Sequence, residues 1–341
     1  MAYTTIDDPE AYFQAKTFAG NNSTQSITLD GDTDLQPDFV WIKSRSDAGE
    51  HTLYDSVRGA TKRFDSADDG AEDTVTNGVT AFNSDGFSLG AGGNENSASS
   101  IISWCWKESA TAGFDIVGYT GDGVIGTTVA HSLSAKPEFI IIKARAGTNA
   151  TNNWYCWHVG LAANKNMSLN TTAAEFTDPG SGIINTTQNT STFGFYSSDS
   201  SGIVNVNEDG TTFIAYLFAP KQGFSKFGSY TGNANADGPF IWTGFSPSFV
   251  MAKMTSGTGN WNTFDNKRTD SDGGNVIDKR IKNNSNAAEI DGTANQVDFL
   301  SNGFKWRGTD DDTNISSGSF VYMAFAEAPF VNSNGVPANA R

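Results

Sequence analysis

The sequence predicts an all-β protein made of three sequence-related units in tandem, each a β-sandwich or jelly-roll-like repeat, with little helix. One strand-like segment occurs three times, and a regular internal repeat of this kind indicates the architecture. The composition, with 36 Gly and only 9 Pro among 341 residues, suits short strands joined by tight polar turns. No stretch shows sustained helical periodicity, which argues against long helices.

The repeated segment has the pattern of a β-strand that begins after a proline and ends at a lysine. Its copies are QPDFVWIK at 36–43, KPEFIIIK at 136–143 and SPSFVMAK at 246–253. β-Branched and aromatic residues favour strands, and proline cannot pair in the interior of a sheet. Each unit also carries a glutamate after small residues. Because the lysine and the glutamate both recur, we expect structural ion pairs between the lysines and the glutamates, namely Lys43, Lys143 and Lys253 with Glu72, Glu175 and Glu289.

The units share three further features. An Asp-Gly or Asn-Gly turn between apolar residues predicts a hairpin at 82–87 and another at 299–304. Runs that are apolar at nearly every position predict central strands buried on both faces, at 101–106, 213–218 and 320–325. One shared position is occupied by Asp55, His158 or Asp265, with Arg58 and Arg268 three residues later in the first and third units.

The repeat divides the chain into a leader at 1–17, three β repeats at 18–110, 111–221 and 222–330, and an extended tail at 331–341. In the leader, Asp8 is suited to cap a short helix and Pro9 to be its first residue. The irregular termini predict assembly contacts at Tyr12, Phe13 and Arg341. Two layouts stay open. The repeats are either separate modules or units that share one core with pseudo-threefold symmetry.

Charge and composition exclude several classes of function. Lys and Arg total 22 against 38 Asp and Glu, a net charge of -16, and this argues against nucleic acid, whose phosphates require a basic face. No apolar run is long enough to cross a membrane, and the first residues lack the pattern of a signal peptide, so we expect synthesis in the cytoplasm and no membrane insertion. Cys105 and Cys156 occupy apolar, non-equivalent positions, which predicts buried free thiols.

The residues that most often carry chemistry form no catalytic pattern. His51, His131 and His158 fall at different places in the repeats, and no Gly-X-Ser-X-Gly motif is present. We therefore expect no enzyme and no obligatory cofactor. Acidic clusters at 68–69, 270–273 and 310–314 carry the oxygen ligands that calcium prefers, but none matches the EF-hand loop. Solvated loop acids are the first interpretation of these clusters, and bound calcium is the alternative.

Several tryptophans are candidates for contact with a carbohydrate or a protein partner. Aromatic rings stack on sugar rings, but a recurring aromatic residue in a β protein is also typical of a core. The candidates are Trp154, Trp157, Trp242, Trp261 and Trp306.

Several motifs together resemble a family of uncharacterised repeat domains in tailed bacteriophages, especially marine phages. These motifs are DPEAYF at 8–13, QPDFVWIK at 36–43, LYDSVRGA at 53–60, FLSNGF at 299–304 and AFAEAPF at 324–330. The resemblance covers nearly the whole chain, and it implies a structural protein of the virion with no catalytic signature. The second repeat departs most from the pattern, since His158 replaces the aspartate and the Asp/Asn-Gly turn is absent.

The expected function is therefore that of a non-enzymatic virion protein on the particle exterior, as a capsid decoration or a component of a tail or head fibre. Its expected partners are other virion proteins, such as the major capsid or tail proteins, and copies of itself. Two alternatives stay open. One is a receptor-binding lectin of a phage tail that recognises a host surface glycan, and the other is a depolymerase that cuts such a glycan.

Overall fold

The computed structural model describes residues 2–148, 150–177, 183–184, 188–196, 204–269 and 276–337, with only the backbone of 183, 184 and 204. The chain is all-β, as predicted, and every strand pair in the sheets is antiparallel. Helix in the described residues is confined to four short segments, which are η1 (Pro9–Ala11), α1 (Val204–Asn207), η2 (Thr293–Asn295) and α2 (Asp311–Asn314).

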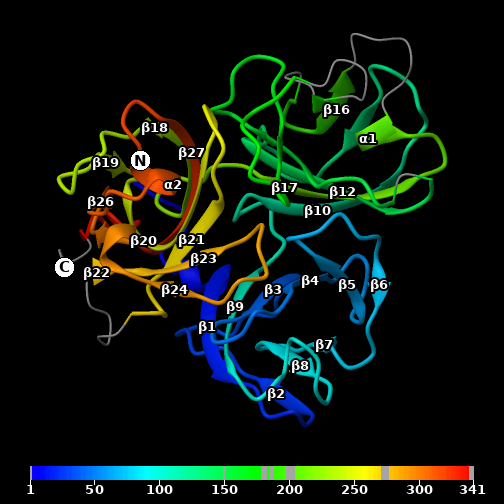
Figure 1. Ribbon diagram of the computed structural model, residues 1–341, viewed down its shortest axis with the longest axis horizontal. Coiled ribbons are helices and arrows are strands. Elements are labelled where there is room, and N and C mark those ends of the chain that lie inside the picture. The colour runs from blue at the N-terminus through cyan, green and yellow to red at the C-terminus, as the bar shows by residue number, and fades with distance from the viewer. Residues whose placement is uncertain are drawn as a thin grey trace.

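The first pair of sheets, which we call module 1, contains the strands β1 to β9 (Figure 1). Its main sheet has the order β1-β9-β3-β4-β5-β6 and consists of β1 (Phe13–Ala19), β9 (Ser100–Trp106), β3 (Phe39–Ser44), β4 (His51–Asp55), β5 (Lys62–Asp65) and β6 (Asp73–Thr74). Its second sheet has the order β2-β8-β7 and consists of β2 (Gln25–Ile27), β8 (Phe87–Leu89) and β7 (Val79–Phe82).

Module 2 contains the strands β10 to β17. Its main sheet has the order β10-β17-β12-β13-β14 and consists of β10 (Phe114–Thr120), β17 (Thr212–Phe218), β12 (Phe139–Ala146), β13 (Tyr155–His158) and β14 (Met167–Ser168). Its second sheet has the order β11-β16-β15 and consists of β11 (Thr128–Ala130), β16 (Thr192–Tyr196) and β15 (Ile183–Ile184).

Module 3 contains the strands β18 to β27. Its main sheet has the order β18-β27-β20-β21-β23-β24 and consists of β18 (Ser225–Thr231), β27 (Ser319–Pro329), β20 (Phe245–Met254), β21 (Trp261–Asp265), β23 (Lys279–Lys282) and β24 (Ile290–Asp291). Its second sheet has the order β19-β26-β25-β22 and consists of β19 (Phe240–Trp242), β26 (Gly303–Trp306), β25 (Val297–Leu300) and β22 (Val276–Ile277).

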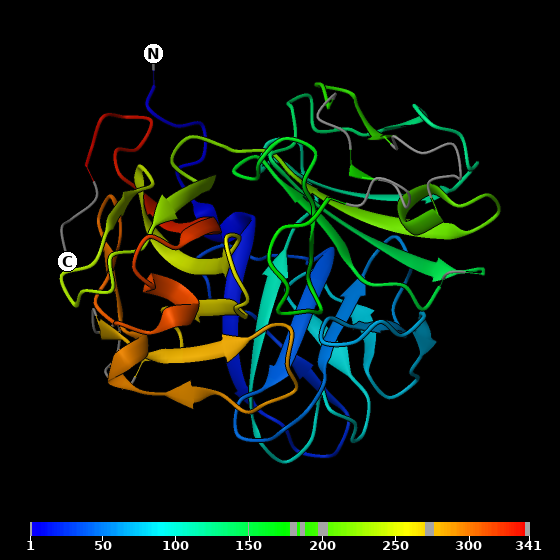
Figure 2. The ribbon, with the colours of Figure 1, turned by 45° about the horizontal axis from the view of Figure 1, so that its top comes forward.

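The three main sheets follow one scheme of pairing. In each, the first strand of the module lies at an edge and pairs with the last strand, which in turn pairs with the strand of the repeated segment. The last strands β9, β17 and β27 are therefore central strands. Successive side chains in them are buried, so both faces of each strand are covered, and the runs at 101–106, 213–218 and 320–325 are accordingly apolar at successive positions. Figure 2 shows the modules as three lobes around one centre.

The repeated strand is buried on both faces because it belongs to two cores at once. In β3, Phe39 and Trp41 face a core that all three modules share, and Val40 and Ile42 face a core between the two sheets of module 1. Side chains alternate in direction along a strand, so one apolar run supplies both cores. The structure thus combines the two layouts that the sequence left open, since the modules are sandwiches that also share a core.

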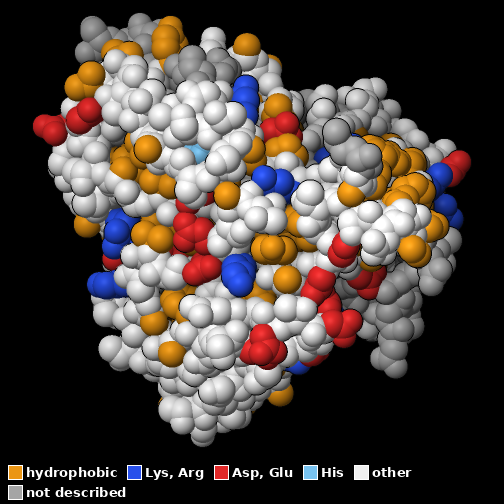
Figure 3. Space-filling view, turned by 180° about the vertical axis from the view of Figure 1, so that it is seen from behind, with side chains coloured by type: hydrophobic (Ala, Val, Ile, Leu, Met, Phe, Trp, Pro, Cys, Tyr) orange, Lys and Arg blue, Asp and Glu red, His pale blue; other side chains and the backbone are white. Residues whose placement is uncertain are grey.

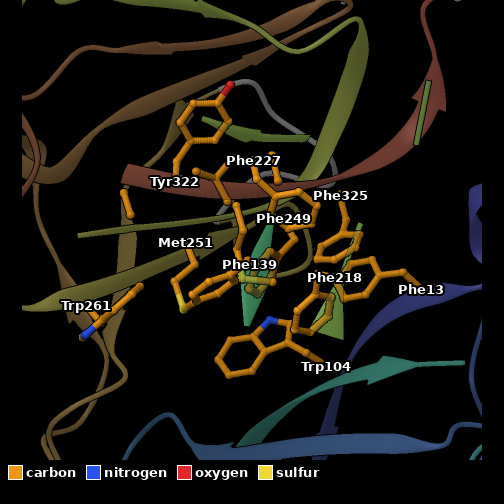
Figure 4. Close-up of a cluster of buried hydrophobic side chains, with 14 of the residues drawn as sticks. Phe13, Trp104, Phe139, Phe218, Phe227, Phe249, Met251, Trp261, Tyr322 and Phe325 are labelled. Carbon is orange, nitrogen blue, oxygen red and sulfur yellow. The ribbon is translucent and has the colours of Figure 1, made fainter. Parts of the chain in front are cut away.

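Aromatic rings from all three modules meet in the shared core (Figure 4). The phenylalanine of each repeated segment packs against an aromatic ring of another module, so that module 1 contacts module 2, module 2 contacts module 3, and module 3 contacts module 1. The ring centroids are 4.6 Å apart for Phe39 and Tyr216, 6.1 Å for Phe139 and Trp261, and 5.7 Å for Phe249 and Trp106. Each such pair contributes about 0.5–1.5 kcal/mol beyond the area that it buries. The contacts therefore close the three modules into a ring.

The leader joins module 1 to module 3. Its prediction as a capped turn is confirmed, since the side chain of Asp8 accepts a hydrogen bond of 3.0 Å from Glu10 N at the start of η1. The hydroxyl of Tyr3 donates to Gly244 O over 2.8 Å, and Asp7 accepts a hydrogen bond from Ser333 N over 2.6 Å. The blue N-terminal segment accordingly lies beside the yellow-to-red module in Figures 1 and 2.

Two predictions for the leader need correction. The predicted boundary at residue 17 falls inside β1, which begins at Phe13. Phe13 is only 2% exposed and stacks on Phe325 with ring centroids 5.1 Å apart, so its predicted role as an assembly contact is wrong. Tyr12 is partly buried against Phe224, at 6.0 Å between centroids, which leaves it little free surface. Arg341 lies outside the described residues.

A third correction concerns Pro247. The sequence predicts a strand that begins after this proline, but β20 starts at Phe245 and includes it. The pairing of β20 with β27 shifts register on both sides of Pro247, because a residue without an N–H is tolerated in a sheet at such an irregularity. The predicted hairpins are present as the pairs β7–β8 and β25–β26, and Cys105 and Cys156 are buried free thiols as expected.

Candidate functional site

The three recurring lysines are held by backbone carbonyls. Each Nζ donates to the carbonyl of the residue after it, over 2.6 Å for Lys43, 3.2 Å for Lys143 and 2.7 Å for Lys253. Lys143 also donates to Asp69 O in module 1 over 3.2 Å, and Lys253 to Ala173 O in module 2 over 2.8 Å. All three side chains are fully buried, and this desolvation lowers the pKa of each lysine to about 8.

The predicted ion pairs between these lysines and the recurring glutamates are therefore wrong. The glutamates instead lie at the contacts between neighbouring modules, which we call seams. The backbone N–H of Glu72 donates to Arg145 O over 3.2 Å, that of Glu175 to Thr255 O over 3.0 Å, and that of Glu289 to Arg45 O over 2.8 Å. Each acceptor lies two residues after a recurring lysine in the next module of the ring. The sequence patterns of lysine and glutamate recur because both belong to these seams.

Two of the glutamates also bind arginines from both sides of their seam. Glu72 lies 2.8 Å from Arg145 Nε and 3.6 Å from Arg58 Nη1, and Glu289 lies 2.8 Å from Arg45 Nη2 and 2.9 Å from Arg268 Nη1. Among the described residues, the seam between modules 2 and 3 has no such cluster, since the residues equivalent to the two arginines are Thr255 and Leu161. There the side chain of Glu175 accepts a hydrogen bond of 3.2 Å from the backbone N–H of Ala162.

The position shared by Asp55, His158 and Asp265 also joins neighbouring modules. The hydroxyl of Tyr216 donates to Asp55 Oδ2 over 2.7 Å, and Trp104 Nε1 donates to Asp265 Oδ2 over 2.9 Å. Within modules 1 and 3 the same oxygens pair with Arg58 and Arg268, whose guanidinium groups are buried.

His158 makes a different contact at the third seam. Its Nδ1 accepts from Gly160 N over 3.0 Å, so the proton lies on Nε2, which donates to Tyr322 O of module 3 over 3.0 Å. Burial lowers the pKa of His158 to about 4, and that of His51 to about 3. His51 lies 3.0 Å from Lys282 O of module 3. Both histidines are therefore neutral structural groups at neutral pH.

Four of the five predicted contact tryptophans are buried, so their predicted stacking on a ligand is wrong. Trp154 and Trp306 have no exposed surface, and Trp261 and Trp157 are 2% and 6% exposed. Trp154 Nε1 donates to Asp65 O of module 1 over 3.0 Å, and Trp261 Nε1 donates to Ser168 O of module 2 over 2.9 Å. These two indoles therefore bind a neighbouring module. Trp306 instead packs on Tyr230 and Phe264 inside module 3.

The acidic clusters take part in local hydrogen bonds. Asp310 caps α2 and lies 2.8 Å from Arg280 Nη1, and Asp312 accepts from the side chain of Asn260 over 2.7 Å. Asp68 accepts from Gly70 N over 2.8 Å. The cluster at 270–273 lies outside the described residues. In the part of the chain that the structure describes, no group of three or more His, Cys, Asp or Glu residues is placed to hold a metal ion.

Trp242 differs from the other predicted tryptophans because half of its surface is exposed. It lies on β19, two residues from Phe240, which is 45% exposed. The two rings and the neighbouring Lys226 and Lys305 form what we call the aromatic strip, an exposed surface with two large aromatic side chains. Sequence reasoning missed Phe240. Alignment of the three repeats could have found it, since the other two carry small residues at this strand.

Comparison with known proteins identifies a family for this chain. No helix in the described residues is long and apolar enough to span a membrane. Neither the curated proteins nor the solved structures include a match to this chain. One family model matches residues 8–329, which include all three modules, and its description is a domain of unknown function, DUF7483. The chain therefore belongs to the DUF7483 family.

Proposed function

We propose that this protein is a non-enzymatic structural component of a tailed-bacteriophage virion, displayed on the particle exterior as a capsid decoration or as part of a tail or head fibre. The observation that carries the proposal is the use of the recurring polar residues. The lysines, glutamates, aspartates and two of the histidines bind across or beside the seams of the ring, where they hold the modules together. Polar groups that stabilise the contacts between modules support a structural role.

The surface charge agrees with such a role. A net charge of -16 keeps copies of the chain apart in solution until they bind a partner, and it disfavours contact with packaged nucleic acid. Figure 3 shows acidic, basic and hydrophobic side chains interspersed over one face, without a single dominant charged field. The resemblance of the sequence motifs to phage repeat domains supplies the assignment to a virion.

Microscopy of purified particles tests the proposal. Antibodies raised against the recombinant chain, detected with gold particles, are expected to label intact virions of a phage that encodes it at a regular position on the head or the tail. The control is an antibody against a replication protein of the same phage, which should not label. A chain that is abundant in the infected cell but absent from purified particles, by labelling and by mass spectrometry, would overturn the assignment.

A further inference from the structure

The aromatic strip has the geometry of a binding site. Phe240 and Trp242 are alternate residues of β19, so both rings lie on one face of the strand, and Ile241 between them is buried at 7% exposure. β19 is the edge strand of its sheet, with β26 as its partner. In Figure 3 a group of hydrophobic side chains with basic and acidic neighbours lies on the side of the molecule that carries β19.

The other two modules show that the fold does not need these rings. The pairs Ile27–Phe87, Val129–Phe193 and Ile241–Phe304 hold the same place in the three second sheets. The residues that flank the first member of each pair are Ser26 and Thr28 in module 1, Thr128 and Ala130 in module 2, and Phe240 and Trp242 in module 3. The same edge therefore forms with small exposed residues, and the two aromatic side chains in module 3 require another explanation.

The rings are also supported from the protein side. Lys226 Nζ lies 4.5 Å from the centre of the Trp242 ring and donates to Trp242 O over 2.7 Å. Two glycines let the rings approach the backbone closely. A Cβ atom at Gly303 would lie 3.0 Å from Phe240 Cε2, and one at Gly244 would lie 3.1 Å from Trp242 Cη2. Such support limits the freedom of the rings before a ligand arrives, which lowers the entropic cost of binding.

The size of the strip indicates a small ligand. Two aromatic side chains that are half exposed offer on the order of 200 Å², whereas a stable protein interface buries about 800 Å² on each partner. A second copy of this chain, or another folded protein, would need more surface than the strip provides. The net charge of -16 disfavours a nucleic acid.

The polar groups beside the rings indicate the chemical class. The ammonium groups of Lys226 and Lys305 can donate to hydroxyl or carboxylate oxygens, and Lys305 is held in place by Asp237 over 2.6 Å. Asp237 is also an acceptor for hydroxyl groups. An apolar aromatic surface bordered by donors and an acceptor matches a pyranose ring, which has an apolar C–H face and a polar rim.

From these observations we propose that the aromatic strip on β19 binds an oligosaccharide, with a pyranose ring stacked on the exposed parts of Trp242 and Phe240 and its oxygens bonded to Lys226, Lys305 and Asp237. The site belongs to module 3 alone, because modules 1 and 2 lack the rings. The inference concerns the isolated chain and does not depend on where the protein lies in a particle.

Binding to a glycan array by the purified full chain tests the proposal, with neutral and acidic oligosaccharides in separate sets. Wild-type protein is expected to bind at least one set. The Trp242→Thr and Phe240→Ser variants carry the residues that module 1 has at the same positions, so both should fold. Each is expected to weaken the affinity about tenfold or more. Lys226→Gln should weaken it by a smaller factor, and Val124→Ala, at an exposed apolar residue of module 2, should leave it unchanged.

Circular dichroism and thermal melting show whether each variant keeps the wild-type fold. A wild-type chain that binds neither the neutral nor the acidic set would overturn the proposal. So would wild-type affinity in a folded Phe240→Ser/Trp242→Thr double variant, since this would place binding elsewhere. Equal loss of affinity in Val124→Ala would also count against it, because that residue lies outside the strip.

Discussion

Trp104 in β9 donates a hydrogen bond of 2.9 Å from its indole Nε1 to Asp265 Oδ2 in β21, across the seam between modules 1 and 3. The same oxygen lies 2.7 Å from Arg268 Nε, and both partners of that ion pair are fully buried. Since no peptide bond joins module 3 directly to module 1, this contact helps to close the ring. Asp55 plays the corresponding part between modules 1 and 2, with Tyr216 as the donor.

The first prediction concerns Asp265. Replacing it with alanine leaves the buried guanidinium of Arg268 without its nearest carboxylate, so the free energy of unfolding should fall by about 3–5 kcal/mol. Urea unfolding measures the change. Asp291→Ala is the matched control, because Asp291 pairs with Lys279 at the surface, and its loss should cost at most about 1 kcal/mol. Equal effects of the two substitutions would contradict a role of Asp265 in holding modules 1 and 3 together.

The second prediction compares the three equivalent glutamates. Glu72→Gln and Glu289→Gln should each lower the free energy of unfolding by about 1–3 kcal/mol, because each removes the charge that pairs with two arginines. Glu175→Gln should change it by no more than about 0.5 kcal/mol, since its carboxylate accepts from a backbone N–H and the amide oxygen can replace it. A cost at Glu175 as large as at Glu289 would contradict the asymmetry of the seams.

The third prediction is a pH dependence from the buried lysines. Burial lowers the pKa of Lys253 to about 8 in the folded chain, from its ordinary value of 10.5. Between these values the unfolded state binds more protons than the folded state, so this lysine makes the protein more stable as the pH rises from 8 toward 10. Between pH 7.5 and 9.5 its contribution should grow by about 1–2 kcal/mol.

The comparison of wild type with Lys253→Met isolates that contribution. Burial raises the pKa of Cys105 to about 12, which acts in the opposite sense, because the unfolded thiol loses its proton first and stability falls as the pH rises. The thiol is present in both proteins, so its effect cancels in the difference. Unfolding curves of the two proteins with the same dependence on pH would rule out titration of Lys253.

The fourth prediction concerns the junctions between modules. Limited proteolysis of the native chain should not produce fragments that end near residues 110 or 220, because Ala112, Ala219 and Phe224 beside these junctions are buried. A truncated chain of residues 111–221 should be unfolded by circular dichroism, since it would expose the face of β12 that carries Phe139 and Ile141. Stable fragments that end at the junctions would show that the modules are independent.

The sequence by itself determined the all-β class and several of the strands. Proline, β-branched residues and Asp-Gly or Asn-Gly turns act on the few residues beside them, and therefore β3, β12 and the hairpin of β7 and β8 could be predicted from local patterns. The burial of β9, β17 and β27 on both faces could also be predicted, because it leaves a continuous apolar run in the sequence.

Only the tertiary structure decided which side chains meet and which stay exposed. Trp104 and Asp265 are 161 residues apart, and their contact exists because three modules close into a ring. The same closure buries Trp154 and Trp261 between modules and gives Lys143 and Lys253 carbonyl partners in a neighbouring module in place of glutamates. Trp242 has the same chemistry as these tryptophans. It is exposed because it lies on the outer face of β19, whereas Ile241 on the opposite face is buried, and which face is covered is a property of the assembled fold and not of the residue.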